Sequence, residues 1–173
     1  FGMLPFYFSG GIPSVTDAFF ETMSGFTTTG ATILDDIESL SHGLLFWRSL
    51  TQWIGGLGIV FFTIAVLPIF GGGTLQLFSA EAIGVTHDKT HPRIDVMAKW
   101  LWMIYAILTI AETVLLMIGG MSFFDAVCHS FSTTATGGYS TKQASVAYWN
   151  SPFIEYVIAI FMILSGINFS LYF

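Results

Sequence analysis

Charged residues are scarce in this sequence: Asp, Glu, Lys and Arg make up 9% of its 173 residues, and only five are Lys or Arg. A soluble domain usually carries about a quarter charged residues, because these side chains form its water-facing surface. By contrast, 54% of the residues belong to the hydrophobic class. Five cations cannot cover a soluble globule of this size, so the solvent around most of the chain must be lipid.

Three further scarcities narrow the possibilities. The single cysteine, Cys128, excludes an internal disulfide bond. The formal net charge of -6 excludes nucleic acid as a partner. The chain begins without a Met or a basic segment, so no signal peptide is recognisable. Because the chain also stops inside an apolar run, we expect both ends to be cuts through a longer protein.

Long apolar runs are what the sequence does contain. Residues 43–70, 100–121 and 152–173 each hold a single charged residue. A helix needs roughly 20 residues to cross about 30 Å of hydrocarbon, and a spanning segment must satisfy its backbone hydrogen bonds internally. The sequence therefore predicts an all-α integral membrane protein that crosses the cell membrane several times, with lipid as its main surrounding.

The distribution of charge predicts the orientation of these segments. Lys89, Arg93 and Lys99 cluster between the first two apolar runs, whereas the acidic residues of segment 35–38 lie before the first run. Cytoplasmic loops of membrane proteins carry an excess of Lys and Arg. We therefore expect the connection at 71–91 to be cytoplasmic and the acidic segment to be external.

An internal repeat at an offset of 108 residues is the most informative pattern. Polar and glycine residues recur at this one offset without a gap, and such matches are much less frequent by chance than apolar ones. The same offset also aligns Gly58 with Gly166 in the following apolar runs. The aligned identical residues are Ser14, Asp17, Ala18, Ser24, Thr28 and Gly30 with Ser122, Asp125, Ala126, Ser132, Thr136 and Gly138.

Each copy of the repeat contains a helix too short to cross the membrane. We expect these helices at 16–26 and 123–132, with Ser14 or Ser122 near the start and an aspartate in the first turn. About ten residues span only about 15 Å. The following strings, 27–32 and 135–140, are rich in Thr and Gly and are poor helix formers.

Spanning helix, half-helix, extended strand and spanning helix is the plan of a potassium-channel pore unit. Extended backbone at membrane depth is tolerated where it lines a water-filled cavity, and its carbonyl groups can replace the hydration shell of a cation. We therefore expect a first pore repeat at 1–70, a connection at 71–91 and a second pore repeat at 92–173. The predicted potassium-binding filter residues are Thr28, Thr29, Gly30, Thr136, Gly137 and Gly138.

Five strings in this order carry a resemblance to a known family: SGFTTTGATIL, FWRSLTQWIGGLGI, HPRI, STTATGGYST and GINF. They resemble the membrane subunit of the Trk potassium-uptake family, which is related to the Ktr and HKT transporters. The resemblance implies four non-identical pore repeats around one pathway, of which this chain covers parts of the first two. It also implies that Gly30 and Gly138 are the filter glycines of their repeats.

The resemblance implies further properties of the complete protein. These are potassium uptake, a bacterial inner-membrane location and a cytosolic nucleotide-binding regulatory subunit; we also expect a homodimer, no organic cofactor and no enzymatic activity. The filter strings depart from those of potassium channels, because Ala31-Thr32 and Tyr139-Ser140 replace a Tyr-Gly ending. We expect a looser filter than that of a channel.

Three charged residues near the predicted pore leave two interpretations each. Glu112 is either a carboxylate of the ion pathway or a hydrogen-bonding group buried between helices. Arg48 either extends along its helix to the membrane surface or repels cations. Glu21 is either a buried hydrogen-bonding group or an attractor of cations at the outer mouth.

Other functions have weaker support in the sequence. His87 and His91 have the spacing of two zinc ligands on a helix, but Pro92 follows and a solvated turn is the simpler interpretation. A serine protease would need Ser24 or Ser165 with His129, and the Thr/Gly repeat would remain unexplained. A purely structural membrane subunit is a further alternative, and a dimeric two-pore-domain potassium channel is the main alternative among transport proteins.

Overall fold

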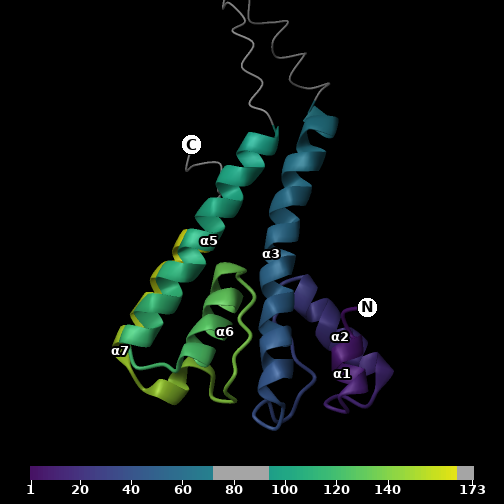
Figure 1. Ribbon diagram of the computed structural model, residues 1–173, viewed down its shortest axis with the longest axis vertical. Coiled ribbons are helices and arrows are strands. Elements are labelled where there is room, and N and C mark those ends of the chain that lie inside the picture. Colours follow the sequence, from purple (N-terminus) through teal and green to yellow (C-terminus); the bar gives the residue numbers. More distant parts are fainter. Residues whose placement is uncertain (72–93, 167–173) are drawn as a thin grey trace, which may run out of the picture.

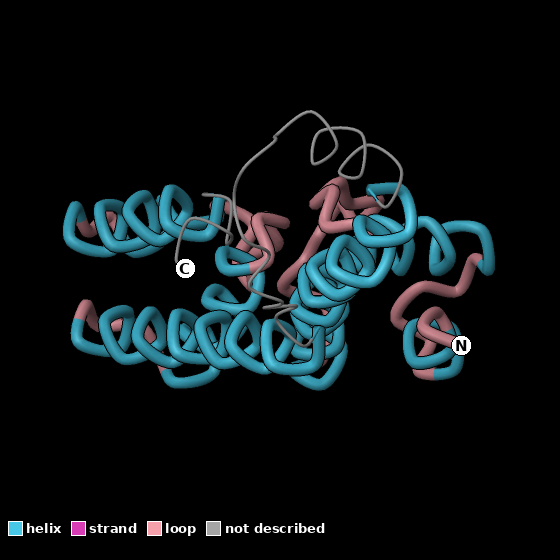
Figure 2. The backbone as a smooth tube through the Cα atoms, turned by 90° about the horizontal axis from the view of Figure 1, so that it is seen from above, coloured by secondary structure: helices cyan, strands magenta, loops and turns pink. Residues whose placement is uncertain are grey.

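The computed structural model describes residues 1–71 and 94–166, with side chains for residues 1–58 and 99–166. In these ranges the chain is helical and contains no strand, as Figure 2 shows. The predicted all-α class is therefore confirmed for the described ranges. The cytoplasmic connection expected at 71–91, with His87 and His91, lies almost wholly outside them.

The first repeat contains three helices. A short helix α1 (Leu4–Phe8) is followed by the half-helix α2 (Val15–Phe26) and the long helix α3 (His42–Gly71). Its 30 residues make α3 about 45 Å long at 1.5 Å per residue. Figure 1 shows α2 beside the lower part of α3, so the half-helix ends well short of the full length of its neighbour.

The second repeat has the same order of elements. The long helix α5 (Ile94–Ile118) precedes the half-helix α6 (Phe123–Thr134), a short 3₁₀ helix η1 (Ser145–Trp149) and α7 (Pro152–Gly166). Figure 1 shows α6 between α3 and α5, and α6 packs against both. The two half-helices therefore lie on either side of α3.

Local sequence explains where the half-helices begin. The Ser14 hydroxyl accepts a hydrogen bond from the Asp17 amide at 3.3 Å, and the Ser122 hydroxyl accepts one from the Asp125 amide at 3.1 Å. Each serine thus satisfies an amide that has no partner within the helix. Both half-helices begin at or within one residue of the predicted positions and end no more than two residues beyond the predicted ends.

Each repeat has a hydrophobic core of its own, while the outer faces of α5 and α7 stay exposed. The exposed residues include Ile107 and Ile110 on α5 and Ile163 on α7, as expected of surfaces that face lipid. Among the described residues, Lys99–Ile118 is long and apolar enough to cross a membrane, with a mean hydropathy of 2.1. The two cores consist of Phe6, Ile12, Ala18, Ile37, Leu40, Leu44 and Leu45 in the first repeat, and of Leu116, Met121, Ala126, Ile154, Val157, Ile158 and Phe161 in the second.

Candidate functional site: two pore loops

Both half-helices end in the same backbone turn. The Thr28 amide donates to the Gly25 carbonyl and the Thr29 amide to the Ser24 carbonyl, with Thr28 in the left-handed region at a φ of 55°. This pair of hydrogen bonds is a Schellman motif, which usually requires glycine at the left-handed position. A β-branched threonine there is an uncommon conformation, of the kind that clusters at functional sites.

The second loop repeats this turn 108 residues later. The Thr136 amide donates to the Thr133 carbonyl and the Gly137 amide to the Ser132 carbonyl, and Thr136 has a φ of 56°. Two residues further on, Gly30 and Gly138 also have left-handed backbones, with φ values of 77° and 83°. The two loops therefore share one backbone course, with left-handed residues at the same alternate positions.

Side chains of each half-helix hold the loop that follows it. The Ser24 hydroxyl donates to the Ala31 carbonyl at 2.5 Å, and the Ser132 hydroxyl donates to the Tyr139 carbonyl at 2.7 Å. Both bonds join residues seven positions apart, at places that the repeat makes equivalent. The C-terminal end of each half-helix, which carries partial negative charge, therefore lies next to an ordered stretch of carbonyl groups.

A second tie also occupies equivalent positions but uses different side chains. In the first repeat the Glu21 carboxylate accepts from the Thr32 hydroxyl at 3.0 Å, and in the second His129 Nε2 lies 3.2 Å from the Ser140 hydroxyl. Both pairs are 11 residues apart. Burial lowers the pKa of His129, on the half-helix α6, to about 4, so its ring is uncharged at neutral pH where the first repeat has a carboxylate.

The two loops touch each other at the glycines. A Cβ atom added to Gly30 would overlap the carbonyl oxygen of Gly137, and one added to Gly137 would overlap the side-chain amide of Gln52. A Cβ added to Gly138 would meet nothing within 4 Å. Gly30 is therefore required both by its backbone angle and by the neighbouring loop, whereas Gly138 is required by its backbone angle alone.

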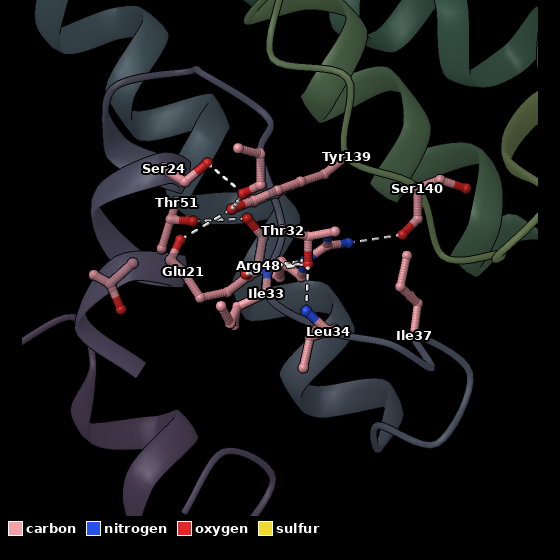
Figure 3. A network of polar contacts seen from close by, with 12 residues as sticks. Glu21, Ser24, Thr32, Ile33, Leu34, Ile37, Arg48, Thr51, Tyr139 and Ser140 are labelled. Atoms are coloured by element: carbon pink, nitrogen blue, oxygen red, sulfur yellow. Dashed lines mark hydrogen bonds and ion pairs between the residues drawn. The ribbon is translucent and has the colours of Figure 1, made fainter. Parts of the chain in front are cut away.

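Arg48 on α3 lies between the loops and is only 2% exposed. Its Nε donates to Glu21 Oε1 at 2.6 Å, and its Nη1 donates to the Ser140 carbonyl at 2.9 Å. Figure 3 shows these contacts together with the Tyr139 ring, whose centroid lies 3.6 Å from the Arg48 Cζ. The interpretation that Arg48 extends to the membrane surface is wrong, because its guanidinium group is buried and bound to both repeats.

The sequence model of the family described as "TrkH: Cation transport protein" matches residues 2–173. This chain belongs to the TrkH family. It is 52% identical to the Trk system potassium uptake protein TrkH of Salmonella typhimurium over 99% of this chain and 36% of that protein. It is 43% identical to the Trk system potassium uptake protein TrkG of Escherichia coli strain K12, over 91% of this chain and 33% of that one.

A solved structure gives the same assignment. The crystal structure of the potassium transporter TrkH from Vibrio parahaemolyticus matches with a TM-score of 0.83 and 42% identity, over 99% of this chain and 34% of that chain. This chain thus spans about a third of the length of its relatives. The predicted fold, a membrane protein built from helices and pore loops, is confirmed, and the two-pore-domain alternative gains no support.

The remaining candidates in this TrkH-family chain divide clearly. Glu21 is a buried hydrogen-bonding group, as one interpretation held, and its second carboxylate oxygen also accepts from the Ile33 amide at 3.0 Å. Glu112 is fully buried, yet within the described ranges neither of its carboxylate oxygens has a hydrogen-bond partner. The protease pairing does not form, because Ser24 bonds its own loop and His129 bonds Ser140.

Sequence reasoning missed the residues that join the loops across the repeats. The Tyr139 amide donates to the side-chain oxygen of Gln52 at 3.2 Å, and the Tyr139 hydroxyl donates to the Glu21 carbonyl at 3.0 Å. One signal was present, since Arg48 and Gln52 lie four residues apart and thus on one face of a helix. Two polar residues on one face of an apolar helix indicate a buried polar contact.

Proposed function

We propose that this chain is part of a potassium-uptake transporter and that its two loops form half of the ion filter. The observation that carries the proposal is the shared course of the two loops, each a half-helix, a left-handed threonine and a left-handed glycine. The relatives named above are potassium uptake proteins by name. The proposed potassium-binding residues are Thr28, Thr29, Gly30, Thr136, Gly137 and Gly138.

The chemistry of the loops suits a dehydrated cation. Carbonyl groups along each loop and the hydroxyl groups of Thr28 and Thr136 supply oxygen ligands that can replace water around the ion. The half-helix ends add partial negative charge at the same place. The nearby cation, Arg48, is paired with the carboxylate of Glu21, so it does not oppose the entry of potassium as an isolated charge would.

The proposal extends to the complete protein. Its four pore repeats surround one pathway, with repeat boundaries in this chain at 1–70 and 92–173 and a cytoplasmic connection at 71–91. It lies in the bacterial inner membrane as a homodimer, binds a cytosolic nucleotide-binding regulatory subunit and uses no organic cofactor. Support comes from family membership and from relatives named as parts of a Trk system.

The test replaces each filter glycine with serine in the full-length protein. Gly30→Ser and Gly138→Ser should lower the preference for potassium over sodium, because a side chain there disturbs the oxygen ligands without entering a helix. Uptake of each ion is measured in proteoliposomes against the amount of protein, with Ala31→Ser as the neighbouring control. An unchanged ion preference in both glycine variants, at normal expression, would remove the filter assignment.

A further inference from the structure

The two repeats differ in one buried group of residues next to the filter loops. The offset of 108 residues places His129 at the position of Glu21 and Tyr156 at the position of Arg48. Tyr156 is 71% exposed, whereas Arg48 is buried between the loops. The ion pair of the first repeat therefore has no counterpart in the second, and it is not part of what forms a single loop.

The ion pair holds the first loop through the carboxylate. Arg48 Nε binds Glu21 Oε1, and the same carboxylate accepts from the Thr32 hydroxyl and the Ile33 amide. Thr32 and Ile33 follow the filter glycine Gly30 by two and three residues. A shift of the guanidinium group would therefore move the carboxylate, and with it the outer part of the first loop.

The same guanidinium group holds the second loop directly. Its Nη1 donates to the Ser140 carbonyl at 2.9 Å and its plane lies over the Tyr139 ring. These two residues immediately follow the filter glycine Gly138. The Tyr139 hydroxyl in turn donates to the Glu21 carbonyl at the first half-helix, so the contact between the repeats is closed from both sides, as Figure 3 shows.

We propose that Arg48 is a positioning residue that sets the spacing of the first two filter loops and thereby the ion selectivity of the transporter. This inference rests on the proposed function of those loops. A planar guanidinium group can donate in two directions and stack on an aromatic ring at the same time, whereas the ammonium group of lysine is a point charge. The three contacts of Arg48 use all of these properties.

Energetic reasoning favours a role in geometry over one in stability. A buried ion pair gains little net stability, because removing two charges from water costs about as much as their attraction returns. A filter distinguishes cations by the number and field of its coordinating oxygens. A side chain that fixes two loops relative to each other controls both quantities, although it does not touch the ion itself.

The experiment uses the full-length protein in proteoliposomes and compares Arg48→Lys, Arg48→Gln and the double variant Arg48→Gln with Glu21→Gln. The control is Lys142→Gln, which removes the cation from the other ion pair between the repeats, an exposed contact at 3.4 Å to Glu38. The readouts are potassium and sodium uptake per folded transporter and the thermal unfolding temperature. The second readout reports on stability alone.

We expect both single variants to lower the potassium-to-sodium uptake ratio by about threefold or more, the low end of what the loss of one net hydrogen bond changes in an equilibrium. The double variant should recover thermal stability, because no buried charge is left unpaired, but not the ratio. The control should keep the wild-type ratio.

Three results would overturn the inference. They are a wild-type ratio in Arg48→Lys, a wild-type ratio in Arg48→Gln with only the unfolding temperature lowered, and a ratio restored in the double variant. If Arg48→Gln does not fold, Arg48→Lys and the double variant decide. Failure of the proposed function is distinguishable, because it would leave the ratio unchanged in the glycine variants, whereas loss of the ratio in those variants alone refutes only the role of Arg48.

Discussion

Replacing each filter glycine with alanine separates two requirements that the loops impose. Gly30 and Gly138 have nearly the same left-handed φ, 77° and 83°. An L-residue in this region costs roughly 1–2 kcal/mol, and the cost should be similar at both positions. The backbone angle by itself therefore predicts equal effects of Gly30→Ala and Gly138→Ala.

The neighbouring loop makes the two positions unequal. The alanine methyl at position 30 would overlap the Gly137 carbonyl oxygen, whereas the methyl at position 138 meets nothing within 4 Å. Overpacking of this kind typically adds about 1–3 kcal/mol and displaces the backbone. We therefore expect a total cost of roughly 1–2 kcal/mol for Gly138→Ala and roughly 2–5 kcal/mol for Gly30→Ala, with the larger loss of ion preference in Gly30→Ala.

The assay measures potassium and sodium uptake by the full-length variants in proteoliposomes, together with thermal unfolding of the purified proteins. Gly43→Ala is the matched control, because a methyl group there meets nothing within 4 Å and the backbone angle is ordinary. Equal losses in the two filter variants, or a larger loss in Gly138→Ala, would show that the contact between Gly30 and the second loop does not exist as described.

Two further predictions concern packing and topology. Gly55→Ala should lower the thermal unfolding temperature, since its methyl group would overlap the backbone of Phe26 and overpacking costs about 1–3 kcal/mol; Gly58→Ala, where a Cβ meets nothing within 4 Å, should not, and equal effects would refute the close approach of α2 and α3. A cysteine replacing Asp36 should react with an impermeant reagent only from the outside of oriented vesicles, with the buried Cys128 as an unreactive background; labelling from the cytoplasmic side would invert the topology.

Local signals explain why the architecture could be predicted from the sequence. A serine cap, an aspartate in the first turn and a Thr/Gly string at the end define a half-helix through contacts within a few residues. The repeat at 108 residues then predicted that two such units exist, and the structure has both. The filter residues themselves stay a prediction, but the shared left-handed turns agree with the spacing that suggested them.

Tertiary structure decided what surrounds each equivalent residue. Arg48 near the end of an apolar helix reads locally as a residue that reaches the membrane surface, yet its partners Glu21 and Ser140 lie 27 and 92 residues away. Gly30 and Gly138 read alike in the sequence, but only Gly30 is in contact with the other loop. The repeat determined the conformation of each loop, because its hydrogen bonds are local. The contacts between the loops arise from how the helices pack, so the asymmetry of the site appeared only in the tertiary structure.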